Sequence, residues 1–117
     1  MTPLLPTGDE AAAAHLTWND KPIPNNSGTF FEIACVHRRY HVPLCRTIWL
    51  GDPPKDIQHA EEVVLEGIDA GIDVARIGNT AGDVARAFYG VLKKHGVARE
   101  GRCGYPIGMS YPPDWGE

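Results

Sequence analysis

The chain has 117 residues, of which 43% are hydrophobic and 22% are charged. This length suits one small domain, and the composition is globular and not disordered. The net charge of -4 disfavours binding of nucleic acid by the chain as a whole. No apolar run reaches the roughly 18 residues that span a bilayer. The start of the chain lacks the basic and apolar regions of a secretory signal. We therefore expect a cytoplasmic location, with no membrane or nucleic-acid partner.

Three cysteines, Cys35, Cys45 and Cys103, cannot all pair within the chain. An odd number without a C-x-x-C spacing disfavours a disulfide scaffold. The ligand spacing of a zinc site with His37 or His41 is also missing. We expect three reduced thiols that pack as small apolar side chains.

Residues 1–28 are rich in proline and turn-forming residues, which predicts an irregular lead-in segment with a short helical piece at 10–14. β-branched and aromatic residues then predict strands over 29–36 and 44–50. The polar segment 37–41 between them predicts a reversal, so the strands form an antiparallel hairpin. This segment is basic, but so short a basic stretch in an acidic chain is weak evidence for nucleic-acid binding.

The hydrophobic period changes after Pro54. Apolar residues three or four apart predict a helix over 56–75. The stripe comprises Ile57, Ala60, Val64, Ile68, Gly71 and Ala75. Gly67 and Gly71 lie on or near it, and a glycine in a helix costs about 1 kcal/mol relative to alanine. We expect the close approach of another backbone at these glycines.

A second helix is predicted over 81–95. Thr80 and Asp83 have the spacing of a capping box at its start, and Gly96 provides a stop after its last turn. Residues 102–117 show neither the hydrophobic period of a helix nor that of a strand. A hairpin, two covering helices and a glycine-rich tail predict an α+β domain with a thin core.

Four parts of the chain occur in a recognisable order. They are Glu32-Ile33-Ala34, Arg46-Thr47-Ile48, the two predicted helices, and Gly104-Tyr105-Pro106-Ile107-Gly108. This order resembles the catalytic domain of the creatinase, aminopeptidase P and methionine aminopeptidase superfamily, which has the pita-bread fold. By this resemblance, residues 29–117 are the first half of an incomplete pita-bread catalytic domain.

Longer stretches are similar to one branch of that superfamily, the ectoine hydrolases. They include Pro3-Leu4-Leu5-Pro6, His15-Leu16-Thr17-Trp18, the basic reversal with the strand after it, and the run from Gly104 to Glu117. The last stretch is long and specific, whereas the others are individually weak. The resemblance covers essentially the whole chain, although it assigns no roles to Asp114, Trp115 or Glu117.

Metallopeptidases of the superfamily hold two divalent ions with two hairpin Asp, the His of Gly-His-x-Ile-Gly and two later Glu. The matching positions here are Glu32, Pro43 and Tyr105, and the two later Glu would lie beyond residue 117. Proline offers no side-chain ligand atom, and a neutral phenol is a poor ligand beside imidazole. The resemblance therefore implies a hydrolase without a metal cofactor.

Creatinase, a metal-free member, hydrolyses a C–N bond of a guanidino acid, and ectoine hydrolase opens a cyclic amidine that carries a carboxylate. Such substrates require an anion for the amidinium, a cation for the carboxylate and a proton-transfer group. The resemblance assigns the first role to Glu32 and the second to Arg46. Tyr105 takes the position of the creatinase His and donates or orients a proton, and His41 is a candidate base.

Each of these residues also has a structural interpretation. Glu32 is then a strand-end carboxylate facing solvent, and Arg46 supports the strands by hydrogen bonds. Tyr105 is then a packed side chain with a bonded hydroxyl, and His41 is a surface residue of the turn.

The first hypothesis is a segment of a metal-independent pita-bread hydrolase that cleaves a C–N bond of a small amidine or amide, similar to ectoine hydrolase. In full-length form it is expected to be a homodimer, and the 117 residues alone are expected to be inactive. One alternative is an Xaa-Pro aminopeptidase-like metallopeptidase. Another is a non-catalytic binding remnant of the fold.

Overall fold

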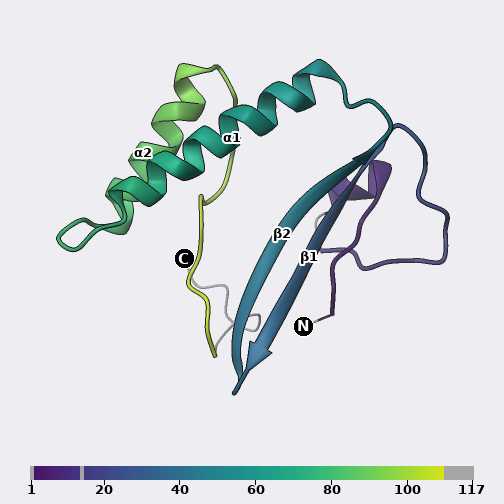
Figure 1. Cartoon of the computed structure of the whole chain (residues 1–117), viewed down its shortest axis with the longest axis horizontal. Coiled ribbons are helices and arrows are strands. Elements are labelled where there is room, and N and C mark those ends of the chain that lie inside the picture. The colour runs from purple at the N-terminus through teal and green to yellow at the C-terminus, as the bar shows by residue number, and fades with distance from the viewer. Residues whose placement is uncertain (1, 14, 110–117) are drawn as a thin grey trace. The chain divides into compact units, whose positions relative to one another are not determined.

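The computed structural model describes residues 2–13 and 15–109. Its elements are the 3-10 helix η1 (Gly8–Ala12), the strands β1 (Ser27–His37) and β2 (Tyr40–Leu50), and the helices α1 (Lys55–Val74) and α2 (Ala81–Lys94) (Figure 1). Strands and helices occupy separate stretches of the chain, which confirms the predicted α+β class. Asp114, Trp115 and Glu117, at the specific end of the tail, lie outside the described residues.

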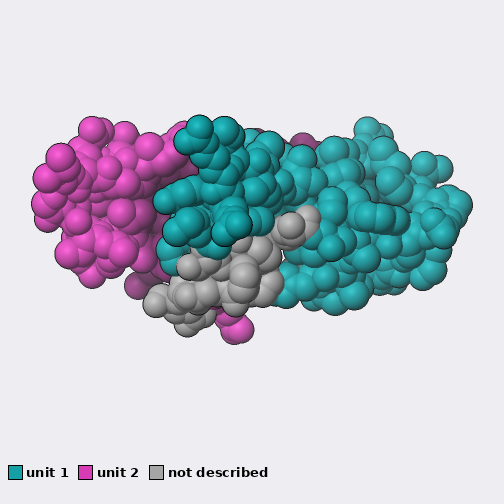
Figure 2. All heavy atoms as spheres, turned by 90° about the horizontal axis from the view of Figure 1, so that it is seen from below, with its two compact units in different colours: residues 1–53, 105–117 teal, residues 54–104 magenta. Residues whose placement is uncertain are grey.

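The chain divides into two compact units (Figure 2). One comprises residues 1–53 with 105–117 and contains the hairpin, and the other comprises residues 54–104 and contains both helices. The predicted boundary at residue 28 does not coincide with this division, and the assignment of 29–117 to a catalytic domain stays a prediction.

The hairpin closes through a two-residue turn. β1 and β2 pair antiparallel along their full lengths, up to His37 opposite Tyr40. Arg38 and Arg39 lie between them with φ values of 49° and 71°. Positive φ at both central residues is what a type I′ turn requires, and this turn matches the twist of the strands. The strands are longer than predicted because the reversal takes two residues and not the whole segment 37–41.

The lead-in segment runs along the free edge of β1. Leu4 and Thr7 form antiparallel bridges with Glu32 and Thr29, respectively. The hydroxyl oxygens of the two threonines lie 3.0 Å apart. η1 follows directly and overlaps the helical piece predicted at 10–14.

Both ends of α2 have the predicted caps. The Thr80 hydroxyl accepts a hydrogen bond from the Asp83 N–H at 3.2 Å, and the Asp83 carboxylate accepts one from the Thr80 N–H at 2.8 Å. This confirms the capping box. After the helix, Gly96 has a φ of 69°, and the N–H of Val97 donates to the carbonyl of Leu92 at 2.9 Å. These features form a Schellman motif, which ends the helix.

The two helices pack together at a glycine of α1. Val63, Phe88 and Leu92 form the buried core of this unit. A Cβ atom on Gly67 would lie 3.0 Å from both Leu92 Cδ1 and Phe88 Cδ2. The prediction of an approaching backbone is wrong at this position, because the close neighbours are large side chains of α2. The missing side chain leaves room for them.

α1 is amphipathic, with Val63, Gly67 and Gly71 as its buried positions. The acidic residues expected on its solvated face are exposed: Asp56, Glu61, Glu62, Glu66 and Asp69. Over residues 2–13 and 15–109, no helix combines the length and apolarity that crossing a membrane requires.

Candidate active site

The strand register sorts the predicted site residues onto two faces of the hairpin. Residues that lie opposite each other in an antiparallel pair share a face, and alternate residues point to opposite faces. We call the face that carries Glu32 the carboxylate face; its polar and proline positions are Glu32, His41, Pro43, Cys45 and Thr47. The other face, which we call the apolar face, carries Ile33, Val42, Leu44 and Ile48 together with Arg46.

Glu32 lies in the middle of β1 and is only 7% exposed. Its N–H and C=O both bond to the backbone of Leu4, each at 2.9 Å. The interpretation of Glu32 as a strand-end carboxylate facing solvent is therefore wrong. A carboxylate buried in a strand is a suitable partner for a cationic substrate, because low exposure strengthens its electrostatic interactions.

Cys45 lies directly opposite Glu32 on β2. Desolvation, followed by the charge of Glu32 and a hydrogen bond with it, raises the pKa of the Cys45 thiol to about 11. All three cysteines are free, but each is exposed, so the expectation that they pack as small apolar side chains is wrong. No motif in the sequence marks Cys45 as a site residue. Its place opposite Glu32 follows from the register, which the two-residue turn at Arg38 and Arg39 fixes.

His41 is half-buried and belongs to β2, not to the turn. Its Nδ1 atom is buried and has no hydrogen-bond partner among the described residues. Its backbone N–H donates to the carbonyl of Gly108 at 3.1 Å, and these two residues form an antiparallel bridge. This bridge brings the end of the Gly104–Gly108 motif, which contains the half-buried Tyr105, to the edge of β2.

Arg46 is not brought together with Glu32 and His41. It is exposed and lies on the apolar face, and its Nη1 atom donates to the backbone carbonyl of Cys45 at 2.7 Å. Its predicted role as the partner of a substrate carboxylate stays a prediction.

The donors on the carboxylate face do not fit a pair of divalent cations. Glu32 offers carboxylate oxygens, but Pro43, two residues before Cys45, has no side-chain donor. Burial and the charge of Glu32 raise the pKa of the Cys45 thiol, which disfavours the thiolate form that a metal binds. No group of three or more His, Cys, Asp or Glu side chains suited to a metal occurs within the described ranges.

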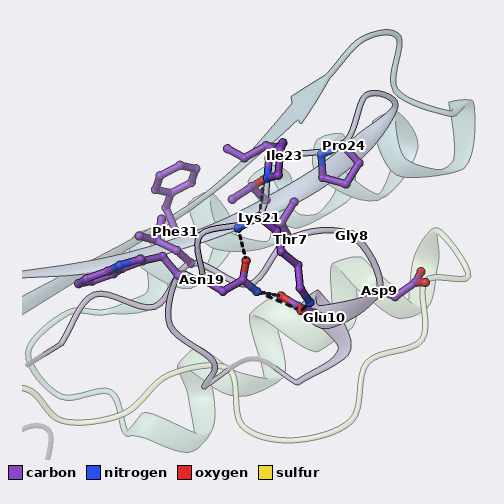
Figure 3. Close-up of a pocket in the computed structure, with 13 residues that line it drawn as sticks. Thr7, Gly8, Asp9, Glu10, Asn19, Lys21, Ile23, Pro24 and Phe31 are labelled. Atoms are coloured by element: carbon purple, nitrogen blue, oxygen red, sulfur yellow. Dashed lines mark hydrogen bonds and ion pairs between the residues drawn. The ribbon is translucent and has the colours of Figure 1, made fainter.

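In the unit that contains the hairpin, a cavity of about 540 Å³ lies between the lead-in segment and β1 (Figure 3). Its walls include the apolar side chains of Trp18, Ile23 and Phe31. The Glu10 carboxylate accepts hydrogen bonds from Lys21 Nζ at 2.9 Å and from Asn19 Nδ2 at 2.9 and 3.1 Å. The hydrogen bond from Lys21 is the main cause that lowers the pKa of Glu10.

This cavity was not predicted from the sequence. It contains none of Glu32, His41, Arg46 or Tyr105. Its polar cluster comes from an η1 residue and a loop, so no periodic pattern in the sequence marks it.

Comparisons with known proteins agree with the pita-bread resemblance. The sequence model of metallopeptidase family M24 matches residues 1–115. An ectoine hydrolase of Halomonas elongata is 55% identical over 118 residues, which cover 100% of this chain and 30% of that protein. The uncharacterized hydrolase/peptidase y4tM of Sinorhizobium fredii is 34% identical over 110 residues, covering 94% of this chain and 28% of that protein.

Solved structures show the same fold. The dipeptidase PepE from Mycobacterium ulcerans superposes with a TM-score of 0.84 at 25% identity, covering 93% of this chain and 30% of that one. The prolidase from Pyrococcus furiosus gives a TM-score of 0.83 at 22% identity, with coverages of 93% and 33%. The chain thus spans about a third of the length of the proteins it matches.

Proposed function

Because the chain belongs to metallopeptidase family M24, we propose that it forms part of a hydrolase that cleaves a C–N bond of a small amidine or amide, as ectoine hydrolase does. The observation that carries this proposal is the 55% identity to the Halomonas enzyme over the whole chain. The buried carboxylate of Glu32 supports it, because an amidinium needs an anionic partner.

Glu32 and His41 share a face, and this supports a division of roles between them. Glu32 pairs with the amidinium group and positions its carbon atom for attack by water. A proton-transfer group takes a proton from that water as its oxygen adds to the amidinium carbon, and it then supplies a proton to the departing nitrogen. The C–O bond thus forms first, and the C–N bond breaks as the tetrahedral adduct collapses to the amide. We assign this group to His41, whose buried Nδ1 has no partner among the described residues, or to Tyr105.

We also propose that the reaction proceeds without a metal ion. Pro43 cannot ligate a metal, and the raised pKa of the Cys45 thiol disfavours the thiolate form that a metal binds. The Glu32 carboxylate then acts as the partner of a cationic substrate.

The test is a chimera in which this chain replaces the 118 aligned residues of the Halomonas enzyme. We expect the chimera to hydrolyse ectoine and to leave Xaa-Pro dipeptides intact. Glu32→Gln should lower kcat/KM for ectoine at least about a hundredfold, because it removes the charge that pairs with the substrate. Glu61→Gln, the same change at an exposed position of α1, is the matched control and should leave activity unchanged.

Two results would contradict the proposal. Hydrolysis of Xaa-Pro dipeptides but not of ectoine would favour the metallopeptidase alternative. A folded chimera that binds ectoine without turnover would favour a non-catalytic binding remnant.

A further inference from the structure

The pair formed by Glu32 and Cys45 is one of the close pairs of the hairpin. Each strand residue directs its N–H and C=O to the same side, and those of Glu32 are directed to Leu4. Glu32 and Cys45 therefore form a non-hydrogen-bonded pair, the kind in which opposite side chains approach most closely.

Three neighbouring backbones thus contribute one row of side chains across the carboxylate face. Leu4 lies on one side of Glu32 and Cys45 on the other. Leucine cannot hydrogen-bond a carboxylate, so in this row the thiol is the side chain that can. A buried carboxylate loses water on folding and needs hydrogen-bond donors in exchange.

We propose that Cys45 is a positioning residue, whose thiol donates a hydrogen bond to the Glu32 carboxylate and holds it in the orientation that receives the substrate cation. This inference rests on the proposed function, because it takes Glu32 as the group that binds the amidinium. A protonated thiol is a donor and a poor nucleophile, so no covalent step is assigned to Cys45. Both the hydrogen bond and the charge of Glu32 favour that protonated form.

The alternative is that Cys45 only fills space beside Glu32. The two interpretations differ in what a substitution does. If the thiol acts as a donor, a hydroxyl of similar size replaces it and a methyl group does not. If the thiol only fills space, serine and alanine lower activity alike.

The test uses the chimera described above. Cys45→Ala should lower kcat for ectoine by about tenfold to a hundredfold, because a misplaced catalytic group loses its alignment with the substrate. Cys45→Ser should retain most of the kcat of the unsubstituted chimera. Cys35→Ala removes a thiol from the apolar face of the same hairpin and should leave kcat unchanged. Equal losses in the alanine and serine variants would overturn the proposal.

A second measurement does not depend on turnover. The rate at which iodoacetamide alkylates Cys45, followed by peptide mass spectrometry, should rise in Glu32→Gln, because that change removes the negative charge that disfavours the thiolate. An unchanged alkylation rate in a folded Glu32→Gln variant would contradict the interaction between Glu32 and Cys45. If the unsubstituted chimera is inactive but Glu32→Gln raises the alkylation rate, the result contradicts the proposed function alone. If the unsubstituted chimera is active but Glu32→Gln leaves the alkylation rate unchanged, the result contradicts the positioning role alone.

Discussion

Two helical glycines, Gly67 in α1 and Gly90 in α2, differ in their surroundings. A Cβ on Gly67 would meet the buried side chains of Phe88 and Leu92, whereas a Cβ on Gly90 would meet nothing within 4 Å. The first glycine is therefore required by packing, and the second is not.

We expect opposite effects from the same substitution at these positions. Gly90→Ala should raise the free energy of unfolding by about 0.5–1 kcal/mol through helix propensity. Gly67→Ala gains the same propensity, but overpacking costs about 1–3 kcal/mol, so the net effect should be a loss. Urea unfolding followed by circular dichroism measures both, and equal stabilisation by the two variants would contradict the packing described for Gly67.

The hairpin turn contains two arginines in a conformation that favours glycine. Arg38 and Arg39 have positive φ, which strains a residue with a Cβ by about 1–3 kcal/mol. Arg39→Gly should therefore stabilise the hairpin by about 1 kcal/mol, after the entropic cost of glycine is subtracted. Tryptophan fluorescence during urea unfolding reports this change. Arg39→Lys keeps the Cβ and the charge, so it should have no effect.

At the scale of the element, α2 depends on the ionised form of Asp83. Hydrogen bonds from the Thr80 hydroxyl and backbone, followed by the ion pair with Arg86, lower the pKa of Asp83 from 3.8 to about 2. Because the folded pKa lies below the unfolded one, ionised Asp83 stabilises the helix above pH 3.8, and this contribution disappears as the pH falls through about 2.

Asp83→Asn should therefore destabilise α2 near neutral pH, because the neutral amide weakens the cap and cannot pair with Arg86. The stability difference between parent and variant should shrink as the pH falls from 3.8 to about 2. Thermal unfolding at several pH values measures this difference. Glu62→Gln, at an exposed position of α1, is the control for the loss of one negative charge. A difference for Asp83→Asn that does not change with pH would argue against this account.

The sequence predicted the elements better than their faces. β-branched and aromatic runs located the hairpin, the helical period located both helices, and the capping box located the start of α2. The apolar stripe of α1 was predicted to include Ile57 and Ile68, but both are more than 40% exposed. The contact between α1 and α2 centres on Gly67 instead. A hydrophobic period does not predict this, because it takes no account of the space that a missing side chain leaves.

Register explains what could not be predicted of the candidate site. Glu32 and Arg46 were both assigned to substrate binding by resemblance, yet they occupy opposite faces. Which residues share a face depends on where the turn lies, and two arginines are not a recognisable turn sequence. The bridge between His41 and Gly108 joins positions far apart in the chain, which no local pattern reveals.

At the scale of the whole molecule, much apolar surface is uncovered. Ile33, Val42, Leu44 and Ile48 on the apolar face are each 50–55% exposed, whereas among residues 2–13 and 15–109 the buried hydrophobic core comprises Val63, Phe88 and Leu92. An exposed apolar sheet face promotes association.

We therefore expect the 117-residue chain to self-associate as its concentration rises. Sedimentation velocity measures this association. Leu44→Lys places a charge on the apolar face and should reduce this association, whereas Glu61→Gln on α1 changes the net charge by the same amount and is the control. A monomer at all concentrations, unaffected by Leu44→Lys, would show that this face does not drive association.

The central claim is that Glu32 acts on a cationic substrate without a metal ion. The most direct measurement is ectoine turnover by the chimera after exhaustive treatment with a chelator, with metal content determined by mass spectrometry on the same sample. We predict an undiminished rate in protein that holds no stoichiometric metal. A rate that falls as metal is removed, and returns when manganese, cobalt or zinc is added, would contradict the claim.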